Sequence, residues 1–140
     1  MKRQKDVRSG LLNVQEKLKP GRVRNIHELA VTEDLLKVVL QYAEENQAHR
    51  VVSINLQVGE LRDFTEEWMQ RYFDYLSRET IAEGGKIVIK KIPVTMECLD
   101  CAHVFNADIR QDNLLCPGCG GAKTKLVSGN EFLIESIGVI

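Results

Sequence analysis

The chain has 140 residues, enough for one domain or for one domain that carries a small module. Its apolar fraction of 44% and charged fraction of 28% are those of an ordinary globular protein, and no apolar run approaches the roughly twenty residues of a membrane span. The net charge of −1 conceals an asymmetry, because residues 1–24 carry +6 and the remainder carries −7. An acidic body argues against nucleic-acid binding through phosphate contacts, so we expect neither a nucleic-acid nor a membrane partner.

The first 25 residues form a basic extension ahead of the main body. Its apolar residues recur at helical spacing before the helix-breaking pair Pro20-Gly21, which is compatible with a short amphipathic helix. These apolar residues are Val7, Leu11, Val14 and Leu18. Because the segment has no aromatic residue and little apolar mass, we expect it to be poorly ordered.

The body opens with a strong helical pattern from His27 to Asn46. Its expected buried stripe consists of Leu29, Leu36, Val39, Leu40 and Ala43. Residues 51–58 then alternate between apolar and polar side chains, which predicts a strand with one buried side. The expected buried side consists of Val52, Ile54, Leu56 and Val58.

A second helix is predicted after Thr65, a residue type that caps helices, with acidic residues in its first turn. Its expected inner face consists of Trp68, Tyr72, Tyr75 and Leu76, with Phe73 to one side. A strand is predicted from Lys86 to Met96, with a bulge near Lys90. Two more strands, 123–127 and 131–139, are predicted around the turn-forming residues 128–130.

The only four cysteines form two Cys-x-x-Cys pairs, Cys98 with Cys101 and Cys116 with Cys119. The fourteen residues between the pairs are enough to fold both onto one tetrahedral ion, and four sulfurs leave no open position for chemistry. We therefore predict a structural zinc site, with a rubredoxin-like iron site as the alternative metal. Two disulfides would require an oxidising compartment; no signal-peptide pattern is evident, and we expect a cytoplasmic protein.

Four features, in order, resemble those of the HypA/HybF family of hydrogenase and urease maturation nickel chaperones. They are His27-Glu28-Leu29-Ala30, Val58-Gly59-Glu60-Leu61, the two cysteine pairs, and Gly129-Asn130-Glu131-Phe132. The resemblance covers residues 26–140. It implies an α+β fold with two helices packed on a small, mainly antiparallel three-stranded sheet and an inserted four-cysteine zinc-ribbon-like module.

The resemblance divides the chain into three parts. Residues 1–25 are the basic extension, residues 26–96 and 123–140 form a nickel-binding α+β domain, and residues 97–122 form the inserted zinc-binding domain. It implies no catalytic activity. The family receives Ni²⁺ as cargo and delivers it, with a HypB-type GTPase, to the large subunit of [NiFe]-hydrogenase, and in some bacteria it also serves urease maturation.

The resemblance places the nickel ligands at His27 and Glu28. In the family the chain begins Met-His-Glu, and nickel takes the imidazole together with backbone nitrogens of these residues. Here Ile26 and a longer extension precede His27, so two interpretations of the extension remain open. Either translation starts at Ile26, which would then be Met, or the extension is genuine and Asn25 with Glu28 forms a helix cap much like a capping box.

The two remaining histidines are His103 and His49. His103 lies two residues after Cys101, close enough to approach the zinc or to titrate beside it, but it is equally explained as a solvent-facing turn residue. His49 is expected on the surface.

The alternative function is that of a zinc-ribbon protein-interaction module without a nickel role. A zinc hydrolase would need an open zinc position and a nearby general acid or base, and the sequence around Cys116 offers neither.

Overall fold

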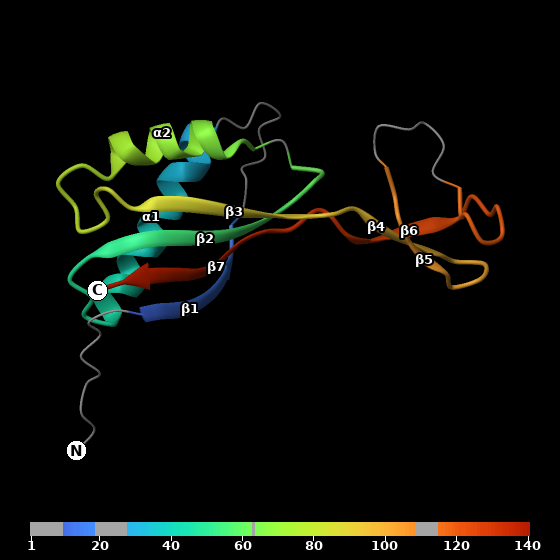
Figure 1. Cartoon of the computed structure of the whole chain (residues 1–140), viewed down its shortest axis with the longest axis horizontal. Coiled ribbons are helices and arrows are strands. Elements are labelled where there is room, and N and C mark those ends of the chain that lie inside the picture. Colours follow the sequence, from blue (N-terminus) through green and yellow to red (C-terminus); the bar gives the residue numbers. More distant parts are fainter. Residues whose placement is uncertain (1–9, 19–27, 63, 109–114) are drawn as a thin grey trace, which may run out of the picture.

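The computed structural model describes residues 10–18, 28–62, 64–108 and 115–140 (Figure 1). Two helices and two separate sheets make up this part of the chain. In chain order the elements are β1 (Gly10–Lys17), α1 (Glu28–Glu45), β2 (Val51–Gly59), α2 (Glu66–Leu76), β3 (Lys86–Ile92), β4 (Thr95–Cys98), β5 (Val104–Asn106), β6 (Thr124–Ser128) and β7 (Phe132–Val139). Neither helix is long and apolar enough to cross a membrane.

The main sheet has four strands in the order β1-β7-β2-β3, with α1 and α2 on one face (Figure 1). The α+β class is confirmed, but the expected three strands are four and the sheet is mixed. β7 is antiparallel to both neighbours, whereas β2 and β3 are parallel, because α2 forms the crossover between them.

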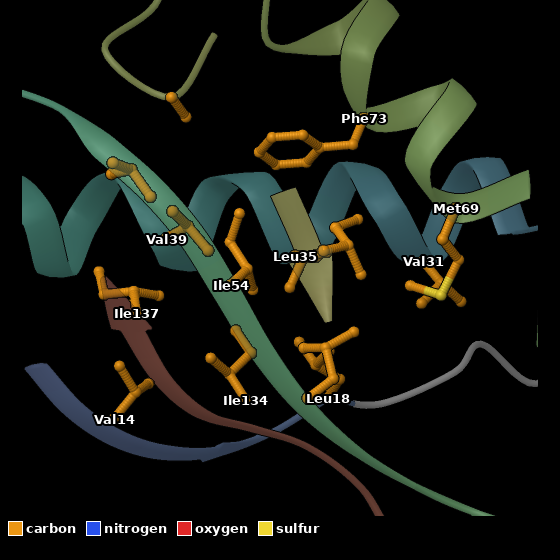
Figure 2. Packing of buried hydrophobic residues seen from close by; sticks show 14 of the residues in the cluster. Val14, Leu18, Val31, Leu35, Val39, Ile54, Met69, Phe73, Ile134 and Ile137 are labelled. Carbon is orange, nitrogen blue, oxygen red and sulfur yellow. The ribbon is translucent and has the colours of Figure 1, made fainter. Parts of the chain in front are cut away.

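The fourth strand comes from the N-terminal extension. Residues 10–17 form the strand β1, which pairs with β7, and not the helix that the apolar spacing allowed for this part of the extension. Val14 and Leu18 share one face of the strand and are buried in the core cluster beside Ile134 and Ile137 (Figure 2). A spacing of four residues suits a helical stripe and one face of a strand equally well, which is why the pattern misled.

One contiguous core lies between the sheet and the two helices (Figure 2). Of the stripe predicted on α1, Val39 and Ala43 are buried and Leu36 and Leu40 are partly buried against the core, but Leu29 is exposed. The buried residues of α1 are Val31, Thr32, Leu35, Val39 and Ala43. In β2 the prediction holds for Ile54, Leu56 and Val58 but not for Val52, because a bulge between Val51 and Ser53 turns Val51 inward and Val52 outward.

The expected inner face of α2 is wrong for Trp68 and Tyr75, whereas Phe73, expected at one side of it, is buried. Met69 and Phe73 are the buried residues, while Trp68 is 45% exposed and Tyr75 is 63% exposed. Arginines stack on both exposed rings: the Arg71 guanidinium lies 5.0 Å from the Trp68 ring centroid and that of Arg78 lies 5.0 Å from the Tyr75 centroid. Trp68 and Tyr75 therefore face solvent, whereas Phe73 packs in the core.

A second, three-stranded sheet in the order β5-β4-β6 carries the cysteines. The predicted strand from Lys86 to Met96 is in fact two strands in two sheets, β3 and β4, divided at Pro93-Val94. Proline has no N–H for a sheet ladder, which fits this division. β6 likewise belongs to the second sheet, whereas β7 returns to the first.

Candidate metal centre

The two cysteine pairs converge at one end of the second sheet. Cys98 closes β4 and is buried, Cys116 is buried as well, and Cys101 and Cys119 are exposed. All four Sγ atoms lie within 4.8 Å of one another, with 3.5 Å between Cys98 and Cys119 and 3.7 Å between Cys101 and Cys116. Zn–S bonds of 2.3 Å in a tetrahedron place sulfurs about 3.8 Å apart, so the donor set fits one such ion.

All four thiols are free, and the closest sulfurs belong to different Cys-x-x-Cys pairs. Both contacts are far longer than the roughly 2.05 Å of a disulfide. The arrangement is that of two turns facing one central point.

Backbone amides in and just after the two turns point at the sulfurs. The N–H groups of Asp100, Gly118 and Gly121 donate to the Sγ atoms of Cys98, Cys116 and Cys119, at 3.4, 3.3 and 3.4 Å respectively. Each donor lies two residues after its cysteine. Asp100 and Gly118 lie within the Cys-x-x-Cys turns, whereas Gly121 follows the second turn. Such donors favour the thiolate over the thiol.

The thiols differ in acidity. Burial raises the pKa of Cys116, but the backbone N–H groups of Cys119 and Gly118 outweigh it and lower that pKa to about 7. The Gly121 amide lowers the pKa of Cys119, yet contacts with the neighbouring sulfurs of Cys98 and Cys101 raise it to about 12. Four anionic sulfurs this close are stable together only beside a cation, so the cluster is suited to a divalent metal and binding must release protons.

His103 lies next to the cluster but outside the four-sulfur group. Its ring approaches the second turn so closely that a Cβ added at Gly118 would sit 3.7 Å from it, and it stacks on Phe105 with ring centroids 6.1 Å apart. Its carbonyl oxygen accepts a hydrogen bond from the Cys98 N–H at 2.9 Å.

Two of the sequence motifs meet where the chain passes between the sheets. The Gly59 N–H donates to the Glu131 carbonyl and the Leu61 N–H to the Gly129 carbonyl, both at 2.8 Å. A Cβ at Gly59 would collide with the Gly129 carbonyl oxygen. The Glu60 carboxylate accepts the Val94 N–H at 2.9 Å, which fixes the outgoing connection as well. The motifs were visible in the sequence, but nothing there signalled that they touch.

Only one of the two predicted nickel ligands lies within the described residues. Glu28 is the first residue of α1, and His27 lies outside the described residues. His49 is exposed, as expected, beside the loop that leads into β2.

Comparison with known proteins agrees with this architecture. The family described as "Hydrogenase/urease nickel incorporation, metallochaperone, hypA" matches residues 26–139. A hydrogenase maturation factor HypA from Dehalococcoides mccartyi is 41% identical over 114 residues, which is 81% of this chain and 94% of the relative. Its counterpart from Archaeoglobus fulgidus is 36% identical over 112 residues, 80% of this chain and 96% of the relative.

Solved structures show the same fold. A solution structure of HypA protein has a TM-score of 0.64 at 25% identity and covers 83% of this chain and 98% of its own. The Ni metallochaperone HypA from Helicobacter pylori has a TM-score of 0.55 at 25% identity, covering 79% and 95%. The chain described here belongs to the HypA family of hydrogenase/urease nickel-incorporation metallochaperones.

Proposed function

We propose that this protein is a nickel carrier that binds Ni²⁺ near the start of α1 and delivers it to the large subunit of [NiFe]-hydrogenase, together with a HypB-type GTPase. Urease maturation proteins are proposed as a second client system. The observation that carries the proposal is the family match over residues 26–139, which takes in the helix start, both glycine motifs and the cysteine pairs. No catalytic step is assigned to the chain.

The four cysteines are proposed to hold one structural Zn²⁺. Among the described residues 95–108 and 115–128, the only buried side chains are Cys98 and Cys116. The hydrophobic core cluster contains no residue from these segments. A module with so little apolar burial needs another source of stability, and a structural zinc ion contributes on the order of 10 kcal/mol when it folds such a site.

His27 and Glu28 are proposed as nickel ligands. Nickel accepts tetragonal sites of nitrogen and oxygen donors, whereas zinc prefers the tetrahedral sulfur set of the four cysteines. The two metals would therefore be separated by coordination geometry and donor type. The imidazole binds a metal only when neutral. Nickel affinity should therefore fall as the pH drops through about 6.5, the usual pKa of histidine.

The test compares His27→Ala with His49→Ala in the full chain. We expect calorimetric titration to show loss of tight Ni²⁺ binding for His27→Ala, unchanged binding for His49→Ala, and one zinc per chain in both. Equal nickel affinity in the two variants would reject His27 as a ligand. Absence of nickel binding in the unaltered protein would instead favour a zinc-ribbon interaction module.

Delivery is tested separately by mixing the nickel-loaded protein with a hydrogenase large-subunit precursor, with and without the GTPase. Nickel retained on the precursor after separation is the readout. Equal transfer from free nickel ions at the same concentration would contradict a carrier role.

A further inference from the structure

The N-terminal extension covers one long edge of the main sheet. β1 pairs along β7 from Gly10 opposite Val139 to Lys17 opposite Leu133, and the Leu18 N–H donates to the Phe132 carbonyl at 2.9 Å. The family match begins only at residue 26, so this strand is an addition to the shared fold. Without it, β7 would be an edge strand.

The added strand is matched in detail to the one it covers. On β7, Glu135 has no register partner on β2, because Asn55 and Leu56 pair with Ser136 and Ile134. Opposite this irregularity β1 has its own, between Asn13 and Glu16, where Gln15 takes a φ of +50°. The Gln15 side-chain amide donates to the Glu135 carbonyl at 3.3 Å. A left-handed conformation is unfavourable for a residue with a side chain, so this match points to a dedicated pairing.

In addition to its pairing with β7, β1 contacts the core through two apolar side chains and α1 through one hydrogen bond. Val14 and Leu18 are 8% and 7% exposed within the core cluster, and Glu16 accepts a hydrogen bond from the Tyr42 hydroxyl of α1. The rest of the strand is largely exposed, including Leu11 at 69%.

The opposite edge of the sheet is protected in another way. Side chains of α2 take the edge amides of β3: the Ile87 N–H donates to Gln70 at 2.7 Å and the Ile89 N–H to Glu66 at 2.8 Å. β1 itself is a poor template for pairing, because its bulge and its charged residues Glu16 and Lys17 interrupt the row of hydrogen-bonding groups. The strand therefore replaces a regular edge with an irregular, charged one.

If it were uncovered, β7 would be a long edge strand with an apolar inner face, unlike the irregular, charged β1. It is eight residues long and places Phe132, Ile134, Ile137 and Val139 on its inner face. A long apolar edge strand pairs readily with an identical strand, and antiparallel pairing about a two-fold axis gives a closed dimer.

We propose that residues 10–18 act as an intramolecular guard strand. Seated on β7, they keep the protein monomeric; detached, they expose an edge to which β7 of a second copy binds. The proposal depends on neither metal.

The test uses the full chain with Val14→Asp and Leu18→Asp combined, which places two charges in the core contact of the guard strand. Leu11→Asp is the matched control, because it adds the same charge to an exposed position of the same strand. Sedimentation across a concentration series and amide exchange of residues 132–139 are measured on both and on the unaltered protein.

We expect the unaltered protein and Leu11→Asp to remain monomeric with β7 amides protected at every concentration. The double variant should dimerise as its concentration rises. Its β7 amides should exchange at least about tenfold faster when dilute and regain protection in the dimer. A monomeric double variant, or a dimeric unaltered protein, would overturn the proposal.

Should the aspartates abolish folding, as judged by the helical circular dichroism, the combination of Val14→Ala with Leu18→Ala replaces them. It removes the apolar contacts without adding charge. The same concentration-dependent exchange on β7 is expected, and exchange identical to that of the unaltered protein would contradict the guard role.

Discussion

The Tyr42 hydroxyl in α1 lies 3.1 Å from the Glu16 carboxylate in β1 and donates a hydrogen bond to it. This contact joins the first helix of the shared fold to the strand that the extension adds. It also raises the pKa of Tyr42 above its ordinary value of 10, because the hydrogen bond and the neighbouring negative charge both favour the neutral phenol.

Tyr42→Phe should loosen β1 and leave the helices intact, because it removes the hydrogen bond but keeps the ring. Amide exchange of residues 10–18 is the measurement, and we expect it to accelerate while α2 is unchanged. High pH should have the same effect on the unaltered protein. A pKa raised in the folded state contributes stability that is present below pH 10 and lost as the pH rises through the raised value. Tyr42→Phe supplies the control, since its β1 exchange should lack this pH dependence beyond that of intrinsic exchange.

Cys98→Ser should release the zinc and unfold the small sheet without unfolding the main core. The prediction follows because Cys98 and Cys116 are the only buried residues in the described parts of 95–128. Zinc content and amide exchange by region are the measurements. Cys98→Ser with unchanged protection of β4 and β6 would show that the module does not depend on its metal.

Gly59→Ala should destabilise the fold by about 3 kcal/mol, because the new methyl group would collide with the Gly129 carbonyl where the two sheets are joined. Urea unfolding measures the effect. Gly10→Ala is the control, since no atom lies within 4 Å of a Cβ built there. Equal stability of the two variants would mean that the junction adjusts freely.

Deleting residues 1–25 and replacing Ile26 with Met should raise nickel affinity, because a free amine beside His27 would complete a planar nitrogen set. From the sequence, such a deletion would cost little stability. The structure changes that expectation: loss of the buried Val14 and Leu18 should cost about 3 kcal/mol. Calorimetry and the absorption of a square-planar nickel ion test the change in nickel affinity, and urea unfolding tests the loss of stability. Unchanged affinity and spectrum would show that the free amine is dispensable.

The metal cluster was predictable because Cys-x-x-Cys spacing encodes its own turn, and an amide within each turn donates a hydrogen bond to the first cysteine of that turn. The helices were predictable from periodicity, but their buried faces were predicted only in part: Val39, Ala43 and Phe73 are buried as expected. Trp68 and Tyr75 were assigned to the core because they are aromatic, and only the position of α2 over β3 shows that they face solvent. Periodicity identifies an apolar stripe; packing decides which stripe is buried.

The extension is the clearest failure of sequence reasoning. Leu12, Val14 and Leu18 share the parity of a strand face, yet the charged Glu16 between Val14 and Leu18 interrupts the apolar alternation. Its partner strand also lies about 120 residues away, and local sequence carries no information about so distant a pairing. The bulge between Val51 and Ser53 was also not visible in the sequence. A single inserted residue reverses the alternation across the bulge, so Val51 faces inward and Val52 outward.

The way in which the sheet edges are covered also bears on how other proteins recognise this domain. With the β3 amides taken by Gln70 and Glu66, and with β1 interrupted at Gln15, the described edges of the main sheet offer no regular backbone ladder to extend. A partner that docks on this domain must then distinguish it by side chains, and substitutions such as Trp68→Ala could alter partner choice while the fold stays the same. Selectivity of this kind can diverge between relatives one surface residue at a time.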